Sequence, residues 1–317
     1  MYGLAYATGG MIVAGLVYLL FAWLVRKLGI DKINGLFPPV VAGPVIAVIG
    51  LTLVPVATGM ASEHWLVAIF TIAVTVWTMA RAKGFFKLLP VLVGVGAGYL
   101  LSIPLGLVNF TTVLDAPWLA WPKFMLPAFS WKAIAIIAPL ALVTIIEHIG
   151  DIKANGSVVG SDFVESPGLD RTLLGDGLAT VVAGFLGGPA NTTYSENTGV
   201  LALTKVYDPA ILRITAVMAI LLSFVGKFGA LIQTIPTPVM GGISIVLFGM
   251  IASVGLRTLV ENQVDLKDSR NLIIVSLILV FGISGATLTI GPLSFVGMSL
   301  AAIVGILSNK FLFSDAH

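Results

Sequence analysis

Long apolar runs, separated by short polar or proline-containing breaks, cover most of this chain. A helix that crosses the hydrocarbon core of a bilayer needs roughly 20 apolar residues. On that length the pattern predicts eleven membrane segments, at residues 8–27, 38–59, 65–81, 87–107, 131–153, 172–188, 196–205, 209–232, 238–256, 271–288 and 293–311. The two longest breaks lie at 108–130 and 154–171. The pattern therefore predicts an all-α polytopic membrane protein.

The composition agrees with this class. Of the 317 residues, 58% are hydrophobic and only 10% are charged, whereas about 25% of the residues in a typical soluble domain are charged. The net charge of +2 is too small to indicate a nucleic-acid partner. The absence of cysteine excludes disulfides, thiolate metal sites and cysteine nucleophiles. No basic stretch or small-residue cleavage site accompanies the first apolar run, so we expect no signal peptide.

Lysine and arginine are distributed very unequally between the two sides of the predicted spans. Of the 17 basic residues, 14 lie on one side, Lys123 and Lys132 lie on the other, and Lys227 lies within a span. Cytoplasmic loops of membrane proteins carry an excess of Lys and Arg. We therefore expect an inner or plasma membrane protein with a cytoplasmic C-terminus and with Met1 on the outside.

The stretch 187–205 interrupts the apolar pattern most sharply. Pro189 ends the preceding run because proline lacks an N–H and clashes with the previous helical turn. Ser195 suits a helix N-cap, and Glu196 would lie in the first turn of a short half-helix, where the helix dipole favours negative charge. A carboxylate at a broken helix inside a membrane is costly unless it lines a cavity. Glu196 is therefore a candidate binding residue, and compensation of the helix dipole is the alternative interpretation.

Ionisable residues also gather in the span 131–153. Glu147 and Asp151 are four residues apart and so share one helix face, whereas His148 points about 100° away from Glu147. Mutual repulsion and desolvation favour a proton on one of the two carboxyl groups, which suits a proton relay. The alternatives are that Asp151 reaches the cytoplasmic interface and that His148 packs against a neighbouring helix. Asp176 is interpreted as a residue at the cytoplasmic end of its span.

An internal repeat relates the two halves of the chain. The segments Pro39–Gly50 and Pro238–Gly249 match at five positions with a constant offset of 199 residues. The matched spans cross the membrane in opposite directions, which is the inverted repeat of many secondary transporters. The counterpart of 131–199 would precede Met1, so the chain is expected to lack the first three spans of its first repeat. The alternative is a shorter protein with an external N-terminus.

The half-helix segment Tyr194-Ser-Glu-Asn-Thr-Gly-Val-Leu-Ala-Leu-Thr-Lys205 resembles the signature of the nucleobase–ascorbate transporter family of nucleobase:cation symporters. In that signature an acidic or amide residue precedes Asn, any residue and Gly, and a Thr-Arg pair follows. The matching positions here are Asn197, Gly199 and Thr204, and Lys205 replaces the arginine. The acidic residue at 196, the segment Glu147–Asp151, Phe37–Pro39 and Pro238–Gly242 are similar to the uracil permease branch of the family.

The resemblance implies a fold of fourteen helices in two inverted seven-helix repeats, with a short strand and half-helix at 187–205. Residues 1–32 and 108–232 would belong to a core domain, and residues 33–107 and 233–317 to a gate domain. The substrate-binding residues would be Glu147, Glu196, Ser195 and Tyr194, and proton coupling would involve Asp151 and His148. The two glutamates would accept the N–H groups of the ring, and backbone N–H groups near Ser195 would donate to a ring carbonyl.

The function implied by the resemblance is proton-coupled uracil import, with no cofactor other than the coupling ion and with homodimerisation through the gate domain. The alternatives are transport of xanthine, another purine or a small anion, and a remnant that binds without transporting. We expect that the chain does not transport alone, because the opposing strand of the site would lie before Met1. An intramembrane metalloenzyme site is a further alternative, although no His-Glu-x-x-His pattern occurs.

Overall fold

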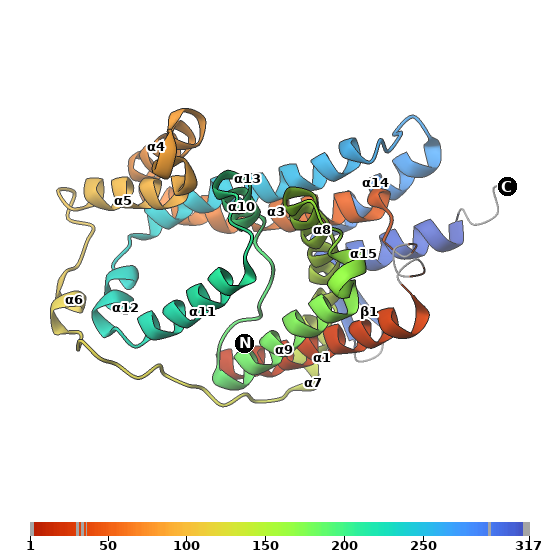
Figure 1. The fold of residues 1–317 in the computed structure, drawn as a ribbon, viewed down its shortest axis with the longest axis horizontal. Coiled ribbons are helices and arrows are strands. Elements are labelled where there is room, and N and C mark those ends of the chain that lie inside the picture. The colour runs from red at the N-terminus through yellow and green to blue at the C-terminus, as the bar shows by residue number, and fades with distance from the viewer. Residues whose placement is uncertain (1–2, 30–31, 33–34, 36, 291–292, 313–317) are drawn as a thin grey trace. The chain divides into compact units, whose positions relative to one another are not determined.

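The computed structural model describes residues 3–29, 32, 35, 37–290 and 293–312, without the side chains of residues 195, 196, 290, 293, 294 and 312. The chain forms two compact units (Figure 1). Unit 1 comprises residues 1–52, 124–198 and 251–317, and unit 2 comprises residues 53–123 and 199–250. The helices α3, α10 and α13, whose bounds follow, each run from one unit into the other.

Unit 1 is built mainly from helices. The helices that lie wholly in the unit are α1 (Leu4–Leu28), α7 (Trp131–Ile137), α8 (Leu140–Val159), α9 (Leu169–Leu186), α14 (Ser269–Ile283) and α15 (Met298–Leu307), with the short π-helices η2 (Val164–Gly168) and η3 (Ser308–Leu312). The unit also contains α3 (Pro39–Ser62) up to residue 52, the first turn of α10 (Ser195–Thr204) and the end of α13 (Thr237–Glu261). Two antiparallel strands, β1 (Thr287–Ile290) and β2 (Leu293–Val296), complete the unit.

Unit 2 holds the remaining parts of α3, α10 and α13. Its other elements are α4 (Trp65–Arg81), the 3₁₀ helix η1 (Gly84–Leu88), α5 (Pro90–Ser102), α6 (Thr111–Asp115), α11 (Pro209–Ser223) and α12 (Gly226–Gln233).

The helix lengths confirm an all-α membrane protein. Four helical stretches of the described chain are long and apolar enough to cross a bilayer: Leu4–Leu28, Pro39–Ser62, Trp131–Val159 and Thr237–Glu261. Shorter apolar helices cover Trp65–Arg81, Pro90–Ser102, Pro209–Ser223, Ser269–Ile283 and Met298–Phe311. Each predicted segment therefore contains at least one helix, although several helices begin or end elsewhere than predicted.

Glycines set the close approach of α1 and α9, which lie side by side in unit 1 (Figure 1). A Cβ atom on Gly177 would lie 2.7 Å from the Cβ of Tyr18 and 3.1 Å from the carbonyl oxygen of Gly15. A Cβ on Gly184 would likewise lie 2.6 Å from Cγ1 of Ile12. Small residues at such positions let helix backbones approach closely. The pairing holds α9, which carries part of the polar site described below, firmly against α1.

Two predicted spans are broken in the structure. The span 131–153 divides into α7 and α8 at Ala138 and Pro139, because proline cannot supply the helical N–H bond. The span 209–232 divides at Phe224 and Val225. There the loop 118–120 takes over the backbone bonds: the N–H of Ala120 donates to Phe224 O at 2.9 Å, and the N–H of Gly226 donates to the carbonyl of residue 118 at 3.0 Å.

The strands do not lie where a strand was expected. Within 187–205 the half-helix α10 is present, but residues 188–194 form an extended segment that no described residue pairs with as a strand. The strand pair lies instead at 287–296, with Thr287 opposite Val296, in a region predicted as the end of one span and the start of the next. The residues of β1 alternate β-branched threonine with apolar side chains, which suits a strand.

Candidate functional site

A stripe of polar side chains runs along one face of α8. Glu147, Asp151 and Asn155 follow one another at intervals of four residues, so they share a face. Asp151 is 5% exposed and its neighbour His148 is 4% exposed. Polar groups buried this deeply are costly unless they bind one another or a ligand. This face of α8 is therefore the first component of a candidate site.

The second component is the extended segment 188–194 between α9 and α10. Helix α9 ends at Gly187, which adopts a left-handed conformation with a φ of 86°. The N–H of Gly188 donates to the carbonyl of Ala183 at 2.7 Å, which satisfies a carbonyl that the helix end leaves unpaired. Pro189 follows and prevents the helix from continuing. The segment then remains extended until α10 begins at Ser195.

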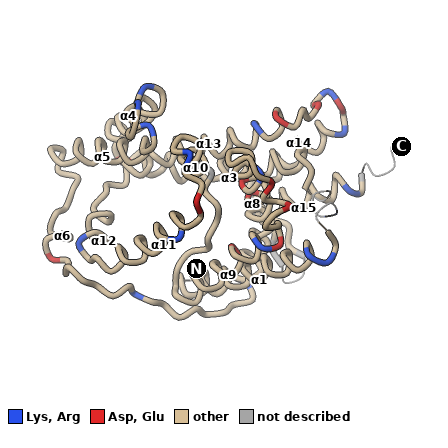
Figure 2. Tube along the Cα trace, in the orientation of Figure 1, with Lys and Arg blue, Asp and Glu red and all other residues tan. Residues whose placement is uncertain are grey.

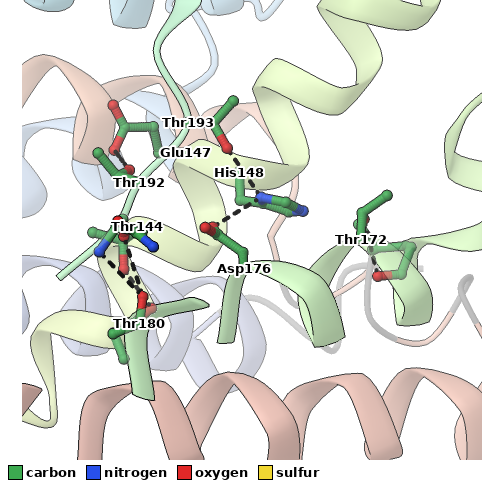
Figure 3. A network of polar contacts seen from close by, with 11 residues as sticks. Thr144, Glu147, His148, Thr172, Asp176, Thr180, Thr192 and Thr193 are labelled. Carbon is green, nitrogen blue, oxygen red and sulfur yellow. Dashed lines mark hydrogen bonds and ion pairs between the residues drawn. The ribbon is translucent and has the colours of Figure 1, made fainter. Parts of the chain in front are cut away.

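Side chains of α8 and α9 hold this segment in place (Figure 3). The N–H of Asn191 donates to Oγ1 of Thr180 on α9 at 3.2 Å. The hydroxyl of Thr192 donates to Oε2 of Glu147 on α8 at 3.3 Å. These bonds take the place of a partner strand, because they satisfy polar groups that would otherwise be unpaired in an apolar setting.

A further bond fixes the start of α10. The hydroxyl of Thr198 donates to Oδ1 of Asn155 at 2.6 Å. The polar stripe on α8 thus makes two contacts. Glu147 contacts the extended segment before the half-helix, and Asn155 contacts the first turn of α10.

His148 connects three elements. Its Nδ1 lies 3.1 Å from Oγ1 of Thr193 and 3.2 Å from Oδ2 of Asp176 on α9 (Figure 3). The Thr193 contact is a hydrogen bond in which the tautomer of the ring decides which atom donates. The Asp176 contact is at ion-pair distance but is not a hydrogen bond. His148 therefore brings α8, α9 and the extended segment into contact.

Tyr18 of α1 closes the other side of the His148 ring. The two rings meet edge to face, with centroids 6.4 Å apart and an interplanar angle of 83°. Tyr18 is 2% exposed. The His148 ring is therefore packed against Tyr18 and bonded to Thr193.

The residues predicted from the family signature lie at or near this network. Tyr194 is 62% exposed at the end of the extended segment. Ser195 was expected to be the N-cap, but it is the first helical residue of α10, and Glu196 follows it in the first turn. The side chains of Ser195 and Glu196 lie outside the described ones, so the predicted opposition of Glu196 and Glu147 stays a prediction.

The supporting residues of the signature are exposed on α10 and at its end. They are Asn197, Gly199, Thr204 and Lys205. Lys205 adopts a left-handed conformation with a φ of 56°, and its N–H donates to Leu201 O at 2.9 Å. The signature therefore includes both the start of the half-helix and the residue that ends it.

Asp176 lies on α9, where its side chain is 14% exposed and at ion-pair distance from His148. Nothing in the sequence indicated this contact, and the placement of Asp176 at the cytoplasmic end of its span stays a prediction. Thr180 and Asn155 were also missed. A sequence signal existed for both: Thr180 follows Asp176 by one helical turn, and Asn155 continues the spacing of Glu147 and Asp151.

Within the part of the chain that the structure describes, which leaves out the side chain of Glu196, no group of three or more His, Cys, Asp or Glu side chains could hold a metal ion.

Comparison with known proteins identifies relatives over nearly the whole chain. The sequence profile of the permease family matches residues 2–291. The "Probable uracil permease" of Pasteurella multocida (strain Pm70) is 46% identical over 320 residues, which is 98% of this chain and 77% of the relative. The uracil permease of Bacillus caldolyticus is 47% identical, over 96% of this chain and 74% of the relative. The uracil permease of Escherichia coli (strain K12) is 44% identical, over 96% and 73%.

Proposed function

Because this chain belongs to the permease family, we propose that it is a secondary transporter that imports uracil together with protons across the inner or plasma membrane. The observation that carries the proposal is the attachment of the extended segment to α8, where Thr192 donates to Glu147 at 3.3 Å. It joins the α8 carboxylate to the extended segment that leads into the signature, within unit 1.

The chemistry of uracil suits this network. The base offers two N–H donors and two carbonyl acceptors, so a selective site needs both kinds of partner. Glu147 is an acceptor on α8, and Glu196 would be the second acceptor. The first backbone N–H groups of a helix have no carbonyl partner within it, so those that open α10 would donate to a ring carbonyl. Broken helices serve the same purpose in other secondary transporters.

Proton coupling is proposed for Asp151 and His148. Both are almost fully buried, and His148 contacts the extended segment through Thr193 at 3.1 Å. A proton that arrives or leaves at His148 changes which atoms of Thr193 and Asp176 can bind to it. Proton binding is thereby connected to the conformation of the segment that holds the base.

The substrate is tested by measuring the binding of radiolabelled uracil to the purified chain in lipid nanodiscs. Glu147→Gln keeps the shape of the side chain and removes its charge. Hydrogen bonds to charged groups contribute about 1.5–3 kcal/mol, so its loss should weaken uracil binding by about 10- to 100-fold. Glu165→Gln, at an exposed carboxylate, is the control and should bind like the unaltered protein. An unaltered protein that binds no uracil in nanodiscs and takes none up in permease-deficient cells would disprove the proposal.

Competition and ion gradients test the finer parts of the proposal. Unlabelled xanthine should not displace uracil, and displacement at equal concentration would indicate a broader nucleobase carrier. Any uracil uptake through the chain should require an inward proton gradient and should be abolished by a protonophore, and uptake that persists would exclude proton coupling. Accessibility labelling of a cysteine added at the C-terminus tests the cytoplasmic orientation, and cross-linking through gate-domain helices tests the proposed homodimer.

A further inference from the structure

A cleft in unit 2 combines an apolar interior with a basic rim. It has a volume of about 480 Å³ and is lined by Trp77, Thr78, Arg81, Ala82, Lys83, Phe86 and Val93. These residues belong to the end of α4, to the turn after it, to η1 and to α5. The volume lies within the 300–1,000 Å³ typical of sites for small organic groups. All of these residues belong to unit 2, whereas the network around His148 belongs to unit 1.

The rim carries positive charge with no acidic counterpart. Arg81 and Lys83 line the cleft, and Lys87 lies one turn further along η1. The sequence from 64 to 114 contains no Asp or Glu, and Figure 2 shows the α4–α5 part of the chain with basic residues only. The structure records no ion pair for any of the three cations among the residues it describes. The partly negative C-terminal end of α4 and the partly positive N-terminal end of α5 both lie beside the cleft, so the two helix dipoles offset each other. The charge at the cleft is therefore set by the basic side chains.

The walls of the cleft suit a hydrocarbon chain. Trp77 precedes Arg81 by four residues, so both lie on one face of α4. Trp77 is 65% exposed and Phe86 is 62% exposed. The hydroxyl of Thr78 is already bonded, since it donates to Val74 O at 2.7 Å, and offers no competing donor. Exposed aromatic rings beside basic residues at the end of a membrane helix are typical of the interface between lipid tails and headgroups.

We propose that this cleft binds an anionic phospholipid, with its phosphate between Arg81 and Lys83 and one acyl chain along Trp77 and Phe86. The guanidinium group of Arg81 can bind two phosphate oxygens at once, and Lys83 adds a point charge. The Lys and Arg count assigns this end of α4 to the cytoplasmic side, where such a lipid enters from the leaflet itself. Neutral phosphatidylcholine would fill the apolar wall but would bring its own cation to a basic rim.

Lipid retention by the full chain tests the proposal. The protein is purified in a neutral detergent, mixed with micelles that contain phosphatidylglycerol or phosphatidylcholine, and examined by native mass spectrometry. Phosphatidylglycerol should remain bound at concentrations at which phosphatidylcholine is lost. Each Lys or Arg near an anionic lipid contributes about fivefold to its affinity, so Arg81→Gln/Lys83→Gln/Lys87→Gln should weaken phosphatidylglycerol binding about 100-fold. Equal retention of the two lipids, or unchanged retention by the triple variant, overturns the proposal.

Matched controls separate a specific site from general attraction. Arg257→Gln/Lys267→Gln removes exposed cations from the end of α13 and from the turn that follows it, where carboxylates also lie, and it should leave retention unchanged. Trp77→Ala should weaken retention severalfold, whereas Trp65→Ala, at the other end of α4, should not. Water-soluble glycerol phosphate should fail to displace the lipid, and displacement at equal concentration would show a phosphate site instead. Uracil binding by each variant verifies that unit 1 remains folded.

Discussion

The ion pair between His148 and Asp176 makes a sharp prediction for Asp176→Asn. The amide has the shape of the carboxyl group but no charge, and Nδ1 of His148 lies 3.2 Å from Oδ2 of Asp176. The substitution therefore isolates the charge of the carboxylate. Because Nδ1 also contacts Thr193 of the extended segment at 3.1 Å, weaker uracil binding should accompany any loss of stability.

The decrease in the free energy of unfolding depends on whether the imidazole of His148 is protonated. A neutral His148 has neither a hydrogen bond nor an ion pair with Asp176 to lose, so the substitution would then have little effect. A protonated His148 would lose the partner of a buried ion pair, which costs about 3–5 kcal/mol. At an ion-pair distance of 3.2 Å we expect this larger loss, and with the histidine 4% exposed it is not strongly screened by water.

The free energy of unfolding is measured in mixed micelles of neutral detergent and SDS, and the uracil dissociation constant is measured on the same samples. The control, Glu165→Gln, removes an exposed carboxylate and should have no effect on either quantity. A double-mutant cycle with His148→Gln assigns the loss to the pair itself. If Asp176→Asn behaves like the control in both measurements, the contact has no energetic role and His148 forms no ion pair with Asp176.

Two further substitutions test the framework of the site. Gly177→Ala should destabilise the fold by about 1–3 kcal/mol through overpacking, since its Cβ would lie 2.7 Å from the Cβ of Tyr18. The control, Gly175→Ala on the same helix, meets no atom within 4 Å and should be neutral or stabilising. Equal effects of the two substitutions on thermal unfolding would refute the close packing. Thr180→Val removes the acceptor that Asn191 uses at 3.2 Å and should weaken uracil binding about fivefold, for a loss of about 1 kcal/mol; an unchanged dissociation constant would show that the segment is held without it.

The sequence predicted best what depends on neighbouring residues. Apolar run lengths located the spans, and Pro189 with its preceding glycines located the end of α9. The spacing of Glu147 and Asp151 was enough to place both on one face of α8, because helix geometry alone decides that relation. The half-helix at Ser195 also follows from local chemistry.

Local patterns were less reliable where a distant segment competes for backbone bonds. The break between α11 and α12 follows from bonds to residues 118 and 120, roughly a hundred positions away along the chain. The β1–β2 pair lies in an apolar region that matches a helix as well as a strand, since short apolar runs do not distinguish the two.

Only the tertiary structure decided which polar groups meet. Asp176 is 28 residues from His148 in sequence, and nothing in its own helix indicates a histidine partner. Their contact depends on how α9 packs, which Gly177 sets through its close approach to α1. The sequence by itself determined the membrane class, the broken helix and the carboxylates of α8. The packing of glycine faces determined that α8, α9 and the extended segment meet at His148, because contacts between helices depend on the shapes of surfaces that are far apart in the chain.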